Sequence, residues 1–361
     1  MDRAQLNFTV ALLQKLAQND KSVILSPLSV STSLFMIYLA ANGKTKQELH
    51  NFLGGTASEY ELRIYFAKVL QNMANVENEN YTLHLANRFY IRQGLSTMKN
   101  FNRTLQLYYG EWLHNFGNGG KYKFVKKVNQ WSSNNTNNKI TELITAKSIT
   151  KNTKMLLLNT IYFKGTWLSQ FFPQATREMT FYISEKKKKK VNMMMKTDHL
   201  LHYEDDSVQA VRLPYVGDEI EMLLILPRIR FRLSKVLQKL TGNDLLKYIH
   251  NATPRRVQLR LPKFRLVGKW DLKEDLKELG ITRAFSRLAE FTKLTYNTLF
   301  LRIMHAGRIA VDEKGTESAA DTEAHWEDPL LVSRRFIADQ PFLFAIVHDK
   351  KTILFAGQFG N

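Results

Sequence analysis

The chain contains no cysteine among its 361 residues. Disulfide bonds, thiolate metal ligands and a cysteine nucleophile are therefore excluded. It also lacks any run of eighteen apolar residues, which predicts that no helix spans a membrane. Acidic residues are few, with 33 Asp and Glu against 52 Lys and Arg, and the formal net charge is +19. Such a charge favours polyanionic partners: sulfated glycans, nucleic acids or acidic membrane surfaces.

Patterns typical of catalytic and nucleotide-binding sites are missing as well. The nine histidines are scattered, without the paired spacing of a zinc site. No Gly-x-Ser-x-Gly, Walker or dinucleotide-binding pattern occurs in the chain. We therefore predict that the protein is not an enzyme and that it holds neither a metal nor a cofactor.

Length and composition predict one folded unit. Hydrophobic residues make up 44% of the chain, and neither an internal repeat nor a linker-like change in composition divides it. A helical pattern begins at once after Met1, without the apolar core of a signal peptide, which indicates a cytoplasmic protein or a mature secreted one. Glycosylation acceptor patterns favour secretion slightly, and they begin at Asn7, Asn80, Asn102, Asn134 and Asn251.

Apolar periodicity predicts a mixture of helices and strands. Helices are expected over residues 3–18, 27–42, 45–53, 59–74, 129–140 and 272–279, and strands over 23–25, 83–90, 155–167, 222–226 and 299–311. Ser26 is predicted to cap the second helix, and Thr45 with Glu48 to form a capping box on the third. Asn159 is an amide within a buried strand and needs hydrogen-bond partners, because burying it unpaired costs a few kcal/mol.

The segment from Asp312 to Leu331 combines the features of a loop with those of a strand. Its small residues alternate in the sequence, at Thr316, Ser318, Ala320, Thr322 and Ala324. Period two places them on one face of an extended strand, yet such a strand has poor β-propensity and little to bury. Either the segment is a solvated loop with accidental alternation, or it waits outside the fold and later enters a sheet as a central strand.

The same segment resembles the hinge and reactive loop of the serpins. DEKGTESAA at 312–320 is followed by FIADQPF at 336–342 and ILFAG at 353–357, which are similar to the serpin carboxyl-terminal signature. Similar phrases cover the rest of the chain: SPLS at 26–29, ANGKT at 41–45, LANRFY at 85–90, NTIYFKGTW at 159–167 and LPKF at 261–264. The resemblance implies a single serpin domain over residues 1–361 with an α+β fold. It would have a large mixed sheet, smaller sheets, about eight or nine helices and an exposed reactive-centre loop at about 313–335.

The resemblance also implies roles for particular residues. The hinge of the loop comprises Glu313, Gly315, Thr316, Ser318, Ala320 and Thr322. A hydrogen-bonded group called the shutter, under the point where the main sheet parts, comprises Ser26, Ser29, Asn159 and His305. The breach, where insertion begins, comprises Trp167, Lys263 and Glu313. The Lys263–Glu313 ion pair would restrain insertion if partly buried and matter little if exposed, and the sequence leaves both open.

The function implied is that of a monomeric protease inhibitor that acts as a suicide substrate and ends in a covalent complex. Family spacing counted from Gly315 puts the primary-pocket residue at Pro329, and counted back from Pro341 at Leu330. Proline suits almost no protease there, so we predict Leu330–Leu331 as the reactive bond and a chymotrypsin-like or elastase-like serine protease as target. Cleavage after Leu331 would instead suit cysteine cathepsins, and a non-inhibitory serpin acting as a binding or chaperone protein is the other alternative.

Basic residues are concentrated in one stretch, where 228–269 contains twelve Lys or Arg and a single acid. A candidate site for heparin or another sulfated glycan comprises Arg232, Lys235, Lys239, Arg255 and Arg256. A generally solvated basic surface explains the same residues equally well.

Overall fold

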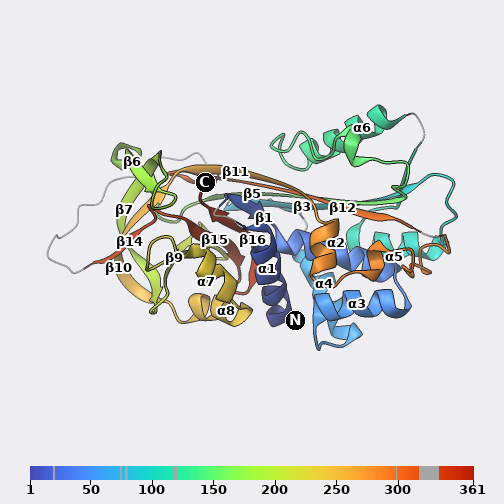
Figure 1. The fold of residues 1–361 in the computed structure, drawn as a ribbon, viewed down its shortest axis with the longest axis horizontal. Coiled ribbons are helices and arrows are strands. Elements are labelled where there is room, and N and C mark those ends of the chain that lie inside the picture. The colour runs from blue at the N-terminus through green and yellow to red at the C-terminus, as the bar shows by residue number, and fades with distance from the viewer. Residues whose placement is uncertain (19–20, 74, 78–79, 118–119, 298, 317–332) are drawn as a thin grey trace.

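The computed structural model describes residues 1–361 except 19–20, 74, 78–79, 118–119, 298 and 317–332 (Figure 1). In that part of the chain the α-helices are α1 (Asp2–Leu16), α2 (Pro27–Ala40), α3 (Gly43–Gly54), α4 (Glu59–Met73), α5 (Lys99–Tyr109), α6 (Lys121–Asn134), α7 (Leu233–Lys239), α8 (Gly242–His250) and α9 (Lys273–Glu278). Short 3-10 turns are η1 (Ala146–Ser148), η2 (Pro173–Ala175) and η3 (Arg283–Phe285). The nine α-helices of the described residues agree with the number expected.

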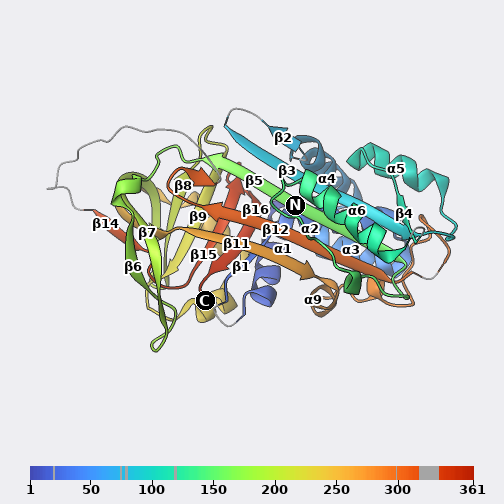
Figure 2. The ribbon, with the colours of Figure 1, turned by 90° about the horizontal axis from the view of Figure 1, so that it is seen from above.

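The described strands form two mixed sheets. The seven-stranded sheet has the order β11 (Phe264–Asp271), β12 (Leu301–Val311), β5 (Met155–Thr166), β3 (Tyr81–Arg92) and β2 (Asn75–Glu77), with β13 (Gly315–Thr316) beside β5 and β4 (His114–Phe116) beside β3. Its long strands run side by side along the molecule in Figure 2. The neighbours β12 and β5 are parallel, whereas β11 and β3 are antiparallel to the strands they flank.

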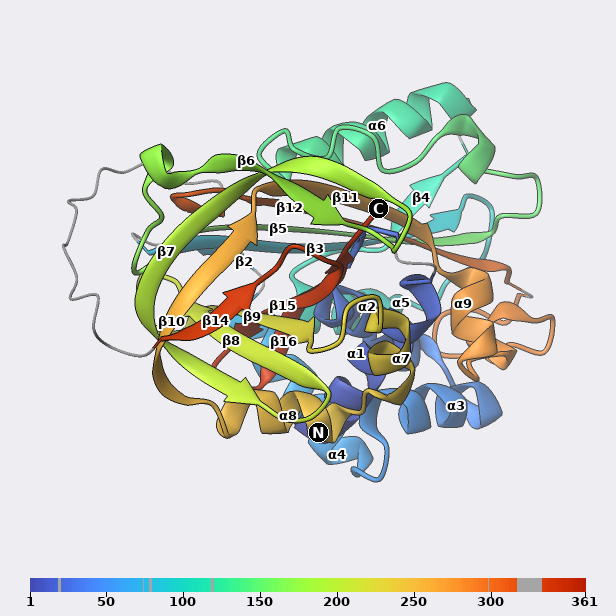
Figure 3. The same ribbon diagram turned by 60° about the vertical axis from the view of Figure 1, so that its left-hand side comes forward.

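The nine-stranded sheet packs beneath one end of the first sheet (Figure 3). Its order is β1 (Val23–Leu25), β16 (Thr352–Phe359), β15 (Phe342–His348), β9 (Ile220–Pro227), β8 (Val208–Pro214), β7 (Lys188–Glu204), β10 (Thr253–Pro262) and β14 (Arg334–Ile337), with β6 (Arg177–Tyr182) beside β7. Together the mixed sheets and the helices give the α+β fold that the sequence predicts.

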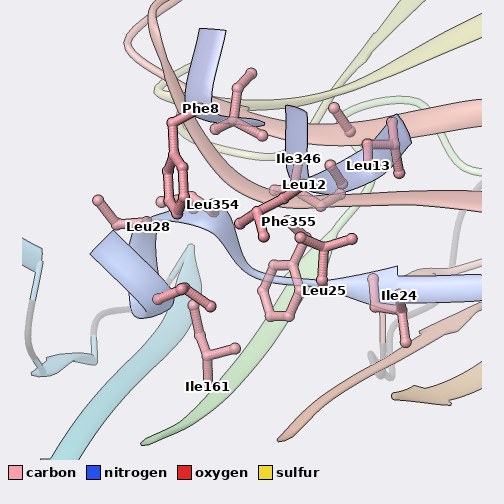
Figure 4. Close-up of a cluster of buried hydrophobic side chains, with 14 of the residues drawn as sticks. Phe8, Leu12, Leu13, Ile24, Leu25, Leu28, Ile161, Ile346, Leu354 and Phe355 are labelled. Atoms are coloured by element: carbon pink, nitrogen blue, oxygen red, sulfur yellow. The ribbon is translucent and has the colours of Figure 1, made fainter. Parts of the chain in front are cut away.

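Helices cover both faces of the seven-stranded sheet. In Figure 1, α6 lies on one side of β3, β5 and β12, and α2 and α4 lie on the other. The main core joins the first helices to both sheets: Figure 4 shows Phe8 and Leu12 of α1, Leu28 of α2, Ile161 of β5 and Phe355 of β16 in one apolar cluster. A smaller cluster lies under α6 and draws residues from β3, β5 and β12.

Most predicted elements are confirmed, including the cap of α2. The Ser26 side chain accepts a hydrogen bond from the backbone N–H of Ser29, and Pro27 stands at the first helical position. The predicted capping box of Thr45 and Glu48 is wrong. The helix begins at Gly43, and the Glu48 carboxylate instead accepts from the backbone N–H groups of Thr282 and Arg283. Tertiary partners compete successfully for both side chains, since Thr45 Oγ1 accepts from the Glu290 N–H.

The predicted helix at 129–140 is wrong at both ends. Helix α6 begins at Lys121, because Phe124, Val128 and Trp131 form a buried apolar stripe that its lysines conceal in the sequence. It ends at Asn134, and Asn138 beyond it has φ of 60°, a left-handed conformation that a helix cannot continue through. Among the described helices, none is long and apolar enough to cross a membrane.

Candidate functional site

The two central parallel strands of the seven-stranded sheet are paired over only part of their length. The register runs from Leu301 opposite Met155 to Gly307 opposite Ile161. Beyond that point β12 continues to Val311 and β5 to Thr166, but the two strands are no longer paired with each other. We call the β5–β12 boundary the seam, and it is closed at one end and parted at the other.

The start of the predicted hinge occupies the parted end of the seam. Gly315 and Thr316 pair antiparallel with Thr166 and Gly165 of β5. Thr316 is fully buried, and its Oγ1 lies 2.8 Å from the hydroxyl of Tyr215. The hinge residues Ser318, Ala320 and Thr322 and the predicted reactive bond Leu330–Leu331 lie outside the described residues.

Glycine is required at position 315 for two reasons. Its φ of +149° is a conformation that side chains rarely adopt, and an added Cβ would stand 2.2 Å from the carbonyl oxygen of Gly165. The turn before it is closed by Asp312, whose Oδ1 accepts from the backbone N–H groups of Lys314 and Gly315. The chain therefore reverses tightly from β12 into the seam.

Trp167 supports this turn from the end of β5. Its ring stacks on Tyr215 with centroids 4.3 Å apart, and its Nε1–H donates to the carbonyl of Asp312 at 3.0 Å. Both rings are buried, and burial raises the pKa of Tyr215 well above its ordinary value. The Tyr215 hydroxyl therefore stays protonated beside Thr316.

The Lys263–Glu313 pair lies at the same end. Lys263 Nζ is 2.6 Å from Glu313 Oε2, and Thr176 donates its hydroxyl to Glu313 Oε1 at 2.8 Å. The Glu313 side chain is 10% exposed and that of Lys263 37%, so the pair is partly buried. Burial raises the pKa of Glu313, but the hydrogen bonds from Lys263 and Thr176, among others, outweigh it and hold the pKa below its ordinary value.

The four predicted shutter residues meet at the closed part of the seam. His305 and Asn159 are cross-strand neighbours on β12 and β5, and Nδ1 of His305 bonds Oδ1 of Asn159. Nε2 of His305 accepts from the backbone N–H of Ser26 at 2.9 Å. Ser29 donates its hydroxyl to Asn159 Oδ1 at 3.1 Å. Since Nε2 is an acceptor, the histidine must be neutral with its proton on Nδ1.

Three further residues extend this network, and sequence reasoning missed them. Asn159 Nδ2 donates to Ser33 Oγ, Ser33 donates to Asn87 Oδ1, and Asn87 Nδ2 donates to Thr32 Oγ1. Asn87 lies opposite Asn159 on β3, so the network crosses three strands above α2. A signal was present: Asn87 is a polar residue on the buried parity of an alternating strand. We call Ser26, Ser29, Thr32, Ser33, Asn87, Asn159 and His305 the polar cluster.

The candidate polyanion residues divide between two places. Arg232, Lys235 and Lys239 border a cavity of about 460 Å³ beside α7. Three carboxylates line the same cavity, from Asp205, Asp206 and Asp244. Arg255 and Arg256 stand apart, at the start of β10. The carboxylates weaken the positive field of the α7 bases, and a glycan site at the five residues stays a prediction.

No cluster of three or more His, Cys, Asp or Glu side chains that could hold a metal ion occurs in the described part of the chain. The residues around the seam instead hold strands of the main sheet together. Hydrogen bonds, an ion pair and a short parallel ladder hold two strands together, and a third strand has begun to pair at their parted end.

This fold and site define a class: an α+β protein in which a short strand pairs with one of two central parallel strands, at the end where those two strands are no longer paired with each other. Comparison with known proteins agrees. The family model described as "Serpin (serine protease inhibitor)" matches residues 3–361. Iripin-8 of Ixodes ricinus is 33% identical, over 99% of this chain and 92% of its own length. The leukocyte elastase inhibitor of Xenopus laevis is 31% identical, over 100% of this chain and 99% of its own.

A solved structure gives the same result. Serpin48, described as a highly specific serpin of the insect Tenebrio molitor, superposes with a TM-score of 0.88 at 27% identity and covers 99% of this chain and 96% of its own. The chain belongs to the serpin family.

The polar cluster predicts a pH dependence of stability. Burial lowers the pKa of His305 to about 3, whereas an unfolded histidine has a pKa of about 6.5. As pH falls below about 6.5, the unfolded chain binds a proton that the folded chain excludes, so stability is lost until about pH 3, at up to about 1.4 kcal/mol per pH unit.

Urea unfolding of the parent and of His305→Gln, followed from about pH 7 to about pH 4, measures this effect. The difference in unfolding free energy between the two proteins should shrink as pH falls. Only the parent has a histidine that binds a proton in the unfolded chain and cannot bind it in the folded one. Parallel curves over that range would show that His305 is not held neutral.

The breach pair predicts a second effect. Glu313→Lys places like charges beside Lys263 and leaves a partly buried charge unpaired, which loosens the parted end of the seam. We expect several-fold more polymer on native gels after mild heating, because a loosened sheet admits the loop of a neighbouring molecule. Glu185→Lys, the same charge change at an exposed residue, is the control. Equal amounts of polymer in the two variants would show that the Lys263–Glu313 pair does not restrain the sheet.

Proposed function

We propose that this serpin inhibits a chymotrypsin-like or elastase-like serine protease as a suicide substrate, with Leu330–Leu331 as the reactive bond. Insertion of the reactive loop into the main sheet is an established property of the family. The proposal is that this chain uses it. The observation that carries the proposal is the pairing of Gly315 and Thr316 with β5 at the parted end of the seam. Under this proposal the chain is an inhibitor and performs no catalysis.

The register of that pairing supports insertion of the whole hinge. A strand continuing from Thr316 opposite Gly165 would reach Met155 with Trp326, and so cover the full length of β5. Every second residue would share the face of Thr316. Ser318, Ala320, Thr322 and Ala324 on that face are small, and the bulky Trp326 comes last, at the far end of the inserted strand. Asp321 falls on the opposite parity, where a charge is tolerable.

The same register places Thr322 opposite Asn159, at the level of the polar cluster. Opening the seam separates Asn159 from His305, which are cross-strand neighbours. A hydroxyl both donates and accepts, so Thr322 could bond the two separated groups and leave neither unpaired. The polar cluster would then stabilise the sheet both before the strands separate and after the loop has inserted between them.

The free energy that strand insertion would supply is comparable to the stability of a protease domain. A twelve-residue central strand adds on the order of ten ladder hydrogen bonds beyond those lost at the seam, or about 10 kcal/mol at about 1 kcal/mol each. A protease domain is stable by about 5–15 kcal/mol. Insertion during the acyl-enzyme stage could therefore distort the protease before it completes hydrolysis.

Helix α6 opposes insertion. The apolar cluster beneath it includes Leu156 and Leu158 of β5 together with Met304 and Ala306 of β12. Separating the two strands must disturb this packing, which supports a loop that waits outside until it is cleaved.

The alternatives follow from the same residues. Cleavage after Leu331 would make cysteine cathepsins the targets, because many of them read the preceding residue. A serpin that binds or chaperones without inhibiting would keep the fold but not insert its loop. Exposed acceptor asparagines at Asn7, Asn134 and Asn251 support action outside the cell.

Two measurements test the proposal. Incubation with chymotrypsin, elastase, cathepsin and trypsin types should give an SDS-stable complex with the first or second type, and mass spectrometry of the released peptide should locate the bond. Thermal unfolding of intact and loop-cleaved protein separates inhibitor from non-inhibitor. Cleavage should raise the melting temperature by tens of degrees if the loop inserts, and an unchanged value with no complex would contradict inhibition.

The hinge gives a further prediction. Thr316→Arg puts a charge into a fully buried site beside Tyr215, at an expected cost of several kcal/mol. The variant should be cleaved as a substrate with little covalent complex. Glu317→Arg, on the opposite parity, should keep the parental stoichiometry of inhibition. A Thr316→Arg variant that inhibits like its parent would refute the assignment of the buried face.

A further inference from the structure

A second basic region surrounds α6 and the segment after it. Residues 121–154 contain eight lysines and a single acidic residue, Glu142. The Glu142 carboxylate is 3.2 Å from Lys269 Nζ, on another element. The stretch itself therefore supplies a single carboxylate against eight lysines, and its own charge is strongly positive.

Some of these lysines border a cavity of about 580 Å³, which we call the α6 pocket. It opens between the end of β3, the start of α6 and the segment around η1, and its bases are Arg92, Lys121, Lys147 and Lys151. None of its described lining residues is acidic. Residues 118–119, adjacent in the chain, are Asn and Gly and add no charge. Four positive charges facing one cavity repel each other, and an anion would relieve that repulsion.

The four bases are available to a ligand in two ways. Lys121, Lys147 and Lys151 are exposed, and their amino groups have no hydrogen-bond or ion-pair partner among the described residues. Arg92 is fixed in place: its Nε donates to the Thr153 carbonyl at 2.8 Å, and its guanidinium lies 5.2 Å from the Phe116 ring centre. A ligand would thus meet one preorganised base and three adaptable ones.

The remaining wall of the pocket is apolar. Phe116 and Phe124 stack with centroids 5.1 Å apart, and Ile149 lies in the same cluster. All three are less than 10% exposed, so core packing holds them and the wall is already formed. A cavity of this size with apolar walls and a few charged groups is typical of a site for a small molecule.

We propose that the α6 pocket binds a small organic anion: a carboxylate, sulfate or phosphate group carried on an alkyl or aryl body. The anionic group lies among Lys121, Lys147, Lys151 and Arg92, and the apolar body lies against the Phe116–Phe124 wall. This site is independent of the reactive loop and of the proposed inhibition.

Isothermal titration of the intact protein tests the site with four probes. Decanoate supplies an anion on an alkyl body, 4-nitrophenyl sulfate an anion on an aryl body, inorganic sulfate the charge alone and decanol the apolar body alone. We expect one-to-one binding of decanoate or 4-nitrophenyl sulfate, at least about tenfold tighter than either single-feature probe. The tighter of the two organic anions identifies the body that the pocket takes.

A matched pair of double variants locates the site. Lys147→Gln with Lys151→Gln should weaken the organic anion about tenfold. Lys123→Gln with Lys126→Gln removes the same charge from exposed positions of α6 outside the pocket lining, and should change binding less than about twofold. Equal losses in the two variants would mean diffuse attraction to a basic surface and would overturn the proposal. Failure of both organic anions to bind, or sulfate alone binding as tightly, would overturn it too.

Discussion

The structure depends on a parallel ladder that is shorter than the strands that form it. Met155–Ile161 of β5 is paired with Leu301–Gly307 of β12, and beyond Ile161 and Gly307 the two strands are no longer paired with each other. Each strand also has an antiparallel neighbour on its other side, β3 for β5 and β11 for β12, so neither strand depends on the seam alone for its pairing. Parallel pairing is slightly weaker per residue than antiparallel pairing, so the seam is weaker per residue than the ladders on either side of it.

Polar contacts suit the seam better than apolar packing does. In the proposed insertion, a closely packed apolar contact would have to leave a void or admit water between the separated strands, whereas a hydroxyl, an amide and an imidazole can exchange partners. His305 illustrates the requirement. It is buried and kept neutral, so it accepts from Ser26 with one nitrogen and donates to Asn159 with the other. A charged residue in its place would carry a large desolvation penalty in both the open and the closed sheet.

Two other features hold the seam from opposite ends. At the parted end, the partly buried Lys263–Glu313 pair and the Trp167–Tyr215 stack support the turn into β13. At the closed end, α6 packs over both strands. The lysines on α6 add little to that packing, because they point away from the buried stripe of Phe124, Val128 and Trp131. Positive charge at these exposed positions therefore does not disturb the core beneath the helix.

The sequence alone determined the class of fold, because local patterns carry it: strand alternation in LANRFY, a buried amide in NTIYFKGTW and the Ser26 cap. It also predicted that Gly315 and the small residues after it could enter a sheet, and only Gly315 and Thr316 of these lie within the described residues. Side-chain partners at long range could not be derived in the same way. Glu48 bonds Thr282 and Arg283, and Asn87 completes the polar cluster, because such contacts join residues far apart in the chain. Only the tertiary structure decided that Thr316 is already buried in the seam, that Glu313 is shielded from solvent and that carboxylates stand beside the bases of α7. The physical reason is that burial and charge compensation depend on what surrounds a residue, and periodicity describes only the residue's own strand or helix.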